Sequence, residues 1–66
     1  MQAVYIRKVL VDSVIESDSY VRYDIVLASD MNIIKSFSNK KQAVNFMMMH
    51  NFDFLGYLPE SRIYID

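Results

Sequence analysis

The chain has 66 residues and no cysteine, so a single hydrophobic core must hold it together. Disulfides and thiolate zinc sites, which stabilise many small domains, are excluded by the missing cysteine. The length predicts one compact domain spanning residues 1–66. A core of this size seldom contributes more than a few kcal/mol. Five Tyr and four Phe raise the apolar area that can be buried, and we expect a homodimer to add the rest.

Hydrophobic alternation predicts three consecutive strands in the first half of the chain. The second strand alternates most regularly. Its odd-numbered residues, such as Tyr23 and Ile25, are apolar and would share one face, whereas Arg22 and Asp24 would share the other. Short polar turns between the strands indicate an antiparallel meander. The predicted strands are residues 3–15, 20–28 and 33–37, and the turns are residues 16–19 and 29–32.

The first predicted strand alternates imperfectly. Val4 and Ile6 share one parity. Val9 and Val11 share the other, and the charged pair 7–8 lies between the two sets. A β-bulge at Arg7 and Lys8 would bring both sets to one face of the sheet. Without a bulge, both faces of this strand must be partly covered.

A single helix is predicted after the third strand. Ser38 is the expected N-cap, and residues 39–50 contain good helix formers. Asn51 suits the left-handed conformation that commonly follows a helix. The remaining predicted elements are a strand at 52–57, a turn at 58–61 that contains Pro59, and a short strand at 62–65.

Together these elements predict an α+β fold. Its expected form is a small antiparallel sheet in the order β-β-β-α-β, with room for a fifth short strand, and one helix packed on one face of the sheet.

The three consecutive methionines of the helix cannot all face the core. On a helical wheel of 100° per residue, Ala43, Val44 and Met47 define the core stripe. Phe46 and Met48 flank this stripe on opposite sides. Because one sheet face cannot easily cover both flanks, we expect Met47 to be buried and the flanks to need another cover.

Met48 and Met49 are candidates for a partner-binding surface. Met49 falls on the polar side of the wheel and has no place in the core of a single chain. Methionine side chains are unbranched and polarisable, so they adapt well to a partner. The simpler alternative is an ordinary exposed methionine. Phe52 and Phe54 follow the helix and either cover its flanks or extend the same surface.

The sequence lacks the patterns of common enzyme sites. One glycine cannot form a phosphate-binding glycine loop, and no serine lies in a G-x-S-x-G motif. His50 ends the helix, where a capping role suits the helix dipole better than catalysis does. The acidic residues do not have the spacing of a calcium loop. We therefore expect no catalytic residues, no cofactor and no metal site.

Lys40 and Lys41 lie in the first turn of the predicted helix, where anions are preferred. With Lys35 they can form a corner that binds phosphate or a partner's carboxylates, and a solvated helix end is the plainer alternative. The corner also permits a different function, a single-stranded nucleic-acid-binding module. The bases of the bound nucleic acid would stack on aromatic side chains of the predicted β-strands, although the net charge of −1 does not favour this function. Those aromatics are Tyr5, Tyr20, Tyr23 and Phe37.

A protein-binding module is the function that the sequence favours. The chain has neither an N-terminal signal-peptide pattern nor a run of ~20 apolar residues, so we expect a cytoplasmic protein without a membrane segment. Residues with AT-rich codons fill more than a third of the chain. We therefore hypothesise a phage-encoded regulator or inhibitor that occupies a surface of a larger host protein. The predicted partner-binding residues are Met48, Met49, Phe52, Phe54, Lys40 and Lys41.

Overall fold

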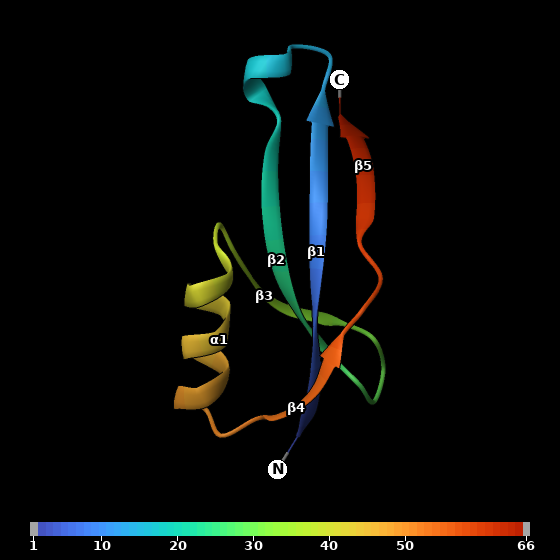
Figure 1. Ribbon diagram of the computed structural model, residues 1–66. Helices are drawn as coiled ribbons and strands as arrows, with labels where there is room; N and C mark the ends of the chain where they lie inside the picture. The colour runs from blue at the N-terminus through green and yellow to red at the C-terminus, as the bar shows by residue number, and fades with distance from the viewer. Residues whose placement is uncertain (1, 66) are drawn as a thin grey trace.

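The computed structural model describes residues 2–65, apart from the side chain of Glu16, as a five-stranded sheet with one helix (Figure 1). The predicted α+β class, the element order and the single helix are confirmed, and the fifth strand is present. The elements are β1 (Ala3–Ser13), a short 3₁₀ turn (Glu16–Asp18), β2 (Tyr20–Leu27), β3 (Ile33–Phe37), α1 (Lys40–Met49), β4 (Asp53–Tyr57) and β5 (Ser61–Ile65).

The long strand β1 lies at the centre of the sheet, antiparallel to β2, which in turn is antiparallel to β3. This confirms the predicted meander. The register of β1 and β2 continues without a shift from Val4 opposite Leu27 to Val11 opposite Tyr20. The alternative of two partly covered faces is therefore correct, and the bulge at Arg7 and Lys8 is not. Val4 and Val11, on opposite faces, are both buried.

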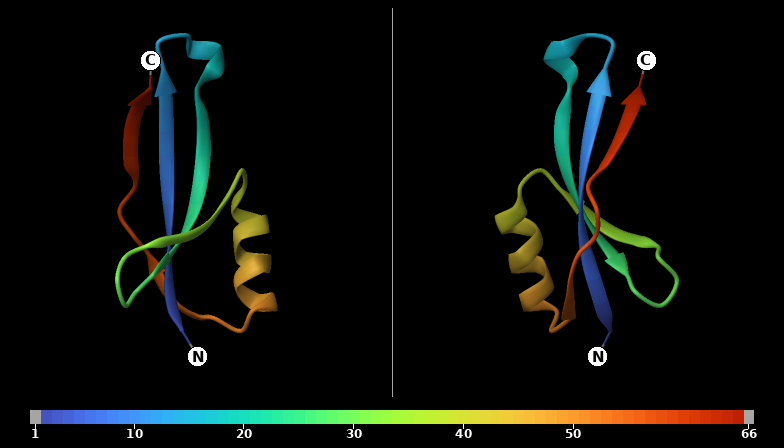
Figure 2. Two further views of the ribbon diagram at one scale, coloured as in Figure 1. Left: turned by 180° about the vertical axis from the view of Figure 1, so that it is seen from behind. Right: turned by 45° about the vertical axis from the view of Figure 1, so that its right-hand side comes forward.

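The sheet is mixed and not antiparallel throughout, because β4 and β5 run parallel to β1. After β3, α1 returns the chain along one face of the sheet, so β4 starts in the same direction as β1 (Figures 1 and 2). The turn predicted at residues 58–61 is wrong, because the chain continues from β4 to β5 in one direction. The Leu58 N–H donates to the Ile6 carbonyl at 2.9 Å. Pro59 has no N–H and interrupts the ladder, so β4 and β5 form one interrupted edge strand.

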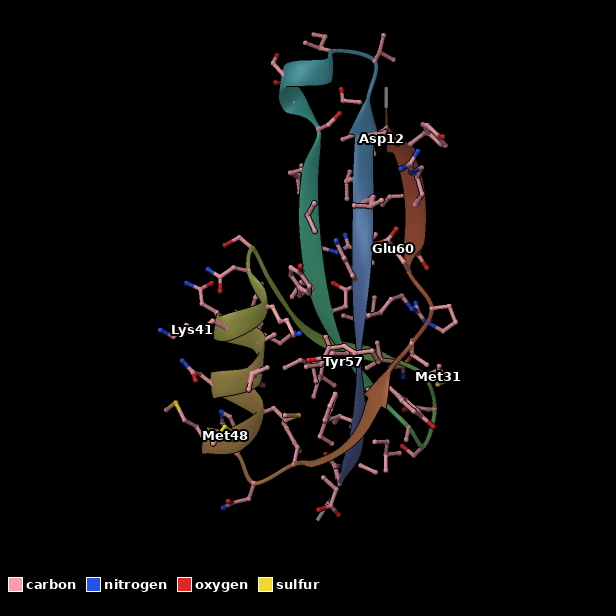
Figure 3. All side chains as sticks on the ribbon, viewed as in Figure 1. Asp12, Met31, Lys41, Met48, Tyr57 and Glu60 are labelled. Atoms are coloured by element: carbon pink, nitrogen blue, oxygen red, sulfur yellow. The ribbon has the colours of Figure 1, made fainter. Side chains whose placement is uncertain are left out.

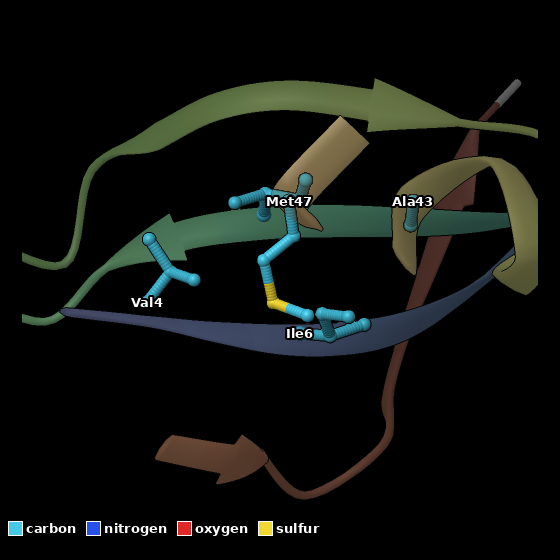
Figure 4. Close-up of a cluster of buried hydrophobic side chains, with 5 residues drawn as sticks. Val4, Ile6, Ala43 and Met47 are labelled. Carbon is cyan, nitrogen blue, oxygen red and sulfur yellow. The ribbon is translucent and has the colours of Figure 1, made fainter. Parts of the chain in front are cut away.

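The helix packs over β2 and β3 and encloses the main core. Ala43 and Met47 are buried against Val4, Ile6 and Ile25. Figure 4 shows Met47 extending from the helix across β2 toward Ile6 on β1. The prediction that Met47 is the core methionine of the run is confirmed.

The helix begins one residue later than predicted. Its N-cap is Asn39 and not Ser38, because the Asn39 Oδ1 accepts a hydrogen bond from the Gln42 N–H at 2.8 Å. Ser and Asn are both favourable N-cap residues, so N-cap preference alone does not predict which of the two caps the helix. His50 is the C-cap residue, as predicted, and Asn51 has a φ of 55°, which confirms the left-handed conformation.

A polar network lies on the sheet face opposite the helix. Alternation placed Asp24 on a polar face, but its side chain is fully buried. The carboxylate accepts hydrogen bonds from Arg22 Nε at 2.7 Å and Nη2 at 3.0 Å. Ser36 Oγ, brought opposite Asp24 by the β2–β3 register, donates a third at 2.6 Å. These bonds offset the cost of burying a carboxylate, so we assign the network to the fold.

Candidate partner-binding surface

A pocket of about 310 Å³ lies between the start of α1 and the strands beneath it. Four side chains from four different elements line it, namely Lys8 of β1, Tyr23 of β2, Lys40 of α1 and Tyr57 of β4. We call this hollow the Lys–Tyr pocket. It is the place where positively charged and aromatic side chains meet on the helix side of the sheet.

Strand register explains how these residues come together. Lys8 lies directly opposite Tyr23 in the antiparallel pair, so their side chains share one face. Tyr57 lies opposite Ile6, two residues before Lys8, and therefore points to the same face. The first turn of α1 then adds Lys40 from above. Three strands and the helix are thus all needed to build the pocket.

The contacts within the pocket leave it with a positive character. Lys40 Nζ lies 4.7 Å from the centroid of the Tyr57 ring, a cation–π contact. Lys8 Nζ lies 3.6 Å from Glu60 Oε1, in an ion pair that is open to solvent. Among the residues that the structure describes, no such carboxylate pairs with Lys40. Two ammonium groups share the pocket with one carboxylate beside it, so an added anion would reduce their repulsion.

An apolar border extends from the pocket along α1 and β4. Lys40, Val44 and Met48 are four residues apart and therefore lie on one side of the helix. Met48 is 66% exposed. On β4, the Phe54 ring packs edge-on against Tyr57 with centroids 5.1 Å apart, and it remains exposed. We call Val44, Met48 and Phe54 the apolar border. In Figure 3, Met48 lies on α1 and Tyr57 on β4.

The six predicted partner-binding residues fall into three groups. Lys40, Met48 and Phe54 gather at the Lys–Tyr pocket and its border. Lys41 is exposed on the outer part of α1 (Figure 3), and Met49 is 80% exposed on the polar side of the helix. Phe52 is the exception, because it packs against the core.

Phe52 covers the other flank of α1. Its ring lies 6.2 Å from that of Phe46 and 5.9 Å from that of His50, measured between centroids. Phe37 of β3 also packs on Phe46, with ring centroids 5.4 Å apart. The expected cover for the Phe46 flank is therefore provided within the chain, whereas Met48 remains uncovered.

The predicted lysine corner is rearranged. Lys35 lies on β3, two strands away from β1, and is not part of the pocket. Lys8 takes its place beside Lys40. Sequence reasoning missed Lys8 and Tyr57 as site residues, and it named Tyr23 only as a base-stacking aromatic. The sequence indicated only that Tyr23 is on the same strand face as Ile25. Lys8 and Tyr57 are far apart in the sequence, so no local pattern predicts that they lie together.

The four strand aromatics considered for base stacking do not form one platform. Tyr23 and Phe37 are opposite each other on the helix side of the sheet. Tyr5 lies opposite Val26 and Tyr20 opposite Val11, which places both on the other face. A single strand of nucleic acid stacks bases along one continuous surface, so these rings cannot all serve it together.

No protein-family model, curated protein or solved structure matches this chain. Within residues 2–65, no helix is both long enough and apolar enough to cross a membrane. In the same part of the chain, no three His, Asp or Glu side chains gather in a way that could hold a metal ion.

Proposed function

We propose that this chain is a small non-enzymatic protein-binding module that binds an acidic, amphipathic segment of a larger protein. The observation that carries the proposal is the Lys–Tyr pocket, where Lys8 and Lys40 meet beside an exposed apolar border. The module acts by occupying its partner's surface, as a regulator or inhibitor, in the cytoplasm. A phage origin stays a prediction from the amino-acid composition.

Charge and shape both support this choice of partner. A carboxylate between Lys8 and Lys40 would form charge-assisted hydrogen bonds and reduce the repulsion between the two ammonium groups. Apolar side chains next to that carboxylate would pack on Met48 and Phe54, which are exposed in the single chain. A segment that alternates acidic and apolar residues satisfies both requirements.

Single-stranded nucleic acid is the alternative ligand, and two observations make it the weaker one. The strand aromatics are divided between two faces of the sheet. The Tyr57 ring, which lies in the pocket, already has Lys40 over one face and Phe54 against it. A base could stack there only by displacing these contacts.

A titration followed by NMR distinguishes the two ligands. The ¹⁵N-labelled protein is titrated with an acidic amphipathic peptide of Glu, Leu and Phe, with a basic peptide of the same length, and with oligothymidine. We expect the acidic peptide alone to shift the amides around Lys8, Lys40 and Tyr57. Shifts caused only by oligothymidine would favour the nucleic-acid alternative. The absence of shifts with all three probes at about millimolar concentration would contradict the proposal.

Matched variants locate the surface. Lys40→Glu should abolish peptide binding, whereas Lys35→Glu, the same charge change at an exposed site on β3, should leave it unchanged. Met48→Ser should weaken binding and Met49→Ser should not, because only Met48 lies at the apolar border. A natural partner captured from a cell lysate is accepted only if it follows this same pattern across the four variants.

The predicted homodimer is part of the proposal. A 66-residue chain without disulfides gains little from its own core, and several large apolar side chains remain exposed, among them Val14, Ile63 and Ile65. A second copy would cover some of them.

A further inference from the structure

The sheet has free edges on both sides, and most of them carry features that hinder pairing with another strand. β3 has a register shift opposite Ile25 and Val26, and its Lys35 is exposed. β4 has a register shift against β1 and contains Gly56, whose φ is +135°. On β2, only Tyr20–Arg22 extends beyond β3, which is too short for a stable pair. Bulges, charges and short edges are common protections of this kind.

β5 lacks these protections. Its five residues pair with β1 in an uninterrupted register from Ser61 to Ile65, without proline or glycine. Its one described charge is Arg62, whose Nε lies 3.4 Å from Asp12 Oδ2 on the neighbouring strand. The pKa of Arg62 is raised above its ordinary value, first by a side-chain hydrogen bond with Tyr64 and then by the Asp12 charge. An unprotected regular edge readily pairs with another strand.

The two faces of β5 are different in character. Ile63 lies opposite Val11 and shares a face with Ile65, and both isoleucines are partly exposed at 39% and 43%. Arg62 and Tyr64 point to the other face, beside Asp12. A partner strand therefore needs apolar residues on one face, and on the other a group that accepts a cation.

We propose that two copies of this chain pair through β5, antiparallel and around a two-fold axis at Ile63, to form one continuous sheet. In this register, Ile63 lies opposite Ile63 of the other copy, and Ser61 lies opposite Ile65. Arg62 lies opposite Tyr64, twice, because the axis repeats the contact. The apolar face thus meets an apolar face, and each guanidinium meets an aromatic ring.

Alternative registers around a two-fold axis are less favourable. An axis at Arg62 would place two guanidinium groups directly opposite each other, and like charges in this position are destabilising. An axis at Tyr64 would pair only residues 63–65 of the described strand. The axis at Ile63 uses all five residues and avoids the charge repulsion, so β5 is complementary to itself. This self-complementarity is the reason for choosing a second copy as the occupant.

The pairing would extend the core of the half without a helix. Ile63 and Ile65 of both copies would form one apolar cluster beside Val11. The pairing rests on the homodimer of the proposed function. The Lys–Tyr pocket and Met48 take no part in it, so a monomer would overturn the pairing and leave the proposed partner binding standing.

Light scattering after gel filtration provides the first test. At about 100 μM we expect twice the chain mass of 7.8 kDa. Ile63→Lys should weaken dimerisation more than about tenfold, because it places two like charges opposite each other. Ile33→Lys is the matched control, since Ile33 is also an exposed edge-strand isoleucine, at 48%, but lies on β3. A monomer for the natural sequence, or an unchanged dimer for Ile63→Lys, would overturn the proposal.

Disulfide trapping provides a second test that does not depend on weakening the protein. Because the chain has no cysteine, Ile63→Cys introduces one thiol per copy. Directly opposed residues of antiparallel strands have Cα atoms about 4.5–5.5 Å apart, within the range of a disulfide. We expect Ile63→Cys to form a covalent dimer under mild oxidation and Ile33→Cys to remain largely monomeric. Equal trapping of the two variants would show that no β5 pair exists.

Discussion

β1 and β2 run through both halves of the molecule, but α1 covers only one of them (Figure 2). In the helix-covered half, Val4 and Ile6 of β1 contribute to the main core cluster beneath Met47. In the helix-free half, residues 9–11 of β1 lie between the start of β2 and β5. The resulting shape is long, 41 × 22 × 16 Å, with a radius of gyration of 12.6 Å, against about 11 Å for a compact chain of this length.

The two halves bury their valines in different ways. Val4 is enclosed from above, because α1 places Ala43 and Met47 over it. Val11 is enclosed from the sides, since it lies between Tyr20 of β2 and Ile63 of β5. Both valines are almost completely buried, at 0% and 1% exposure, but only the helix-covered half has a second layer of secondary structure over the sheet. The helix-covered half should therefore hold most of the stability, and the helix-free half should be the part available for assembly.

The largest expected effect comes from removing the centre of the helix-covered half. Ile25→Ala should lower the free energy of unfolding by about 2–5 kcal/mol, because it leaves a cavity in the core cluster. A domain this small has little more stability than that, so much of the variant should be unfolded at 25 °C. Urea denaturation followed by circular dichroism measures the loss. Loss of hydrogen-exchange protection in both halves together would show that the helix-free half depends on the other. A loss below about 1 kcal/mol would contradict this view of the core.

The same Val→Ala substitution at two sites of β1 compares the two halves directly. Val4→Ala should cost about 2–3 kcal/mol, because the site lies under the helix and cannot collapse freely. Val11→Ala should cost only about 1 kcal/mol, because Tyr20 and Ile63 can move into the space. Urea midpoints measured side by side give the difference directly. Equal costs would mean that the lateral enclosure is as firm as the helix layer.

Local sequence patterns predicted what depends on neighbouring residues, namely the strands, the helix and the position of Met47. They missed what depends on distant pairing. Asp24 reads as a surface residue by alternation, and only Ser36, which lies on the next strand, completes its burial. The direction of β4 and β5 depends on the path of α1 over the sheet. The composition of the Lys–Tyr pocket depends on Lys8 and Tyr57, which approach only through the β1–β4 register.

Gly56→Ala tests the edge of the helix-covered half. Gly56 has a φ of +135°, which side-chain-bearing residues rarely adopt, although no atom lies within 4 Å of an added Cβ. The cost should therefore come from backbone strain and not from a clash, at about 1–3 kcal/mol. Leu55→Ala is the control, because this neighbouring side chain is exposed and its loss should change the unfolding midpoint little. A neutral Gly56→Ala would imply that β4 relaxes to another conformation.

The smallest expected effect concerns the start of α1, and it separates the two candidate caps. Asn39→Ala should lower the free energy of unfolding by about 1 kcal/mol, because the Gln42 N–H loses its acceptor. Asn39→Asp should keep the cap, and Ser38→Ala should have almost no effect. Since the cap belongs to the helix-covered half alone, hydrogen exchange should quicken at Gln42 and Ala43 in Asn39→Ala while the amides of β5 keep their rates. A larger loss for Ser38→Ala than for Asn39→Ala would restore Ser38 as the cap. Faster exchange in β5 would show that even a local loosening of α1 reaches the helix-free half, so that the two halves unfold as one.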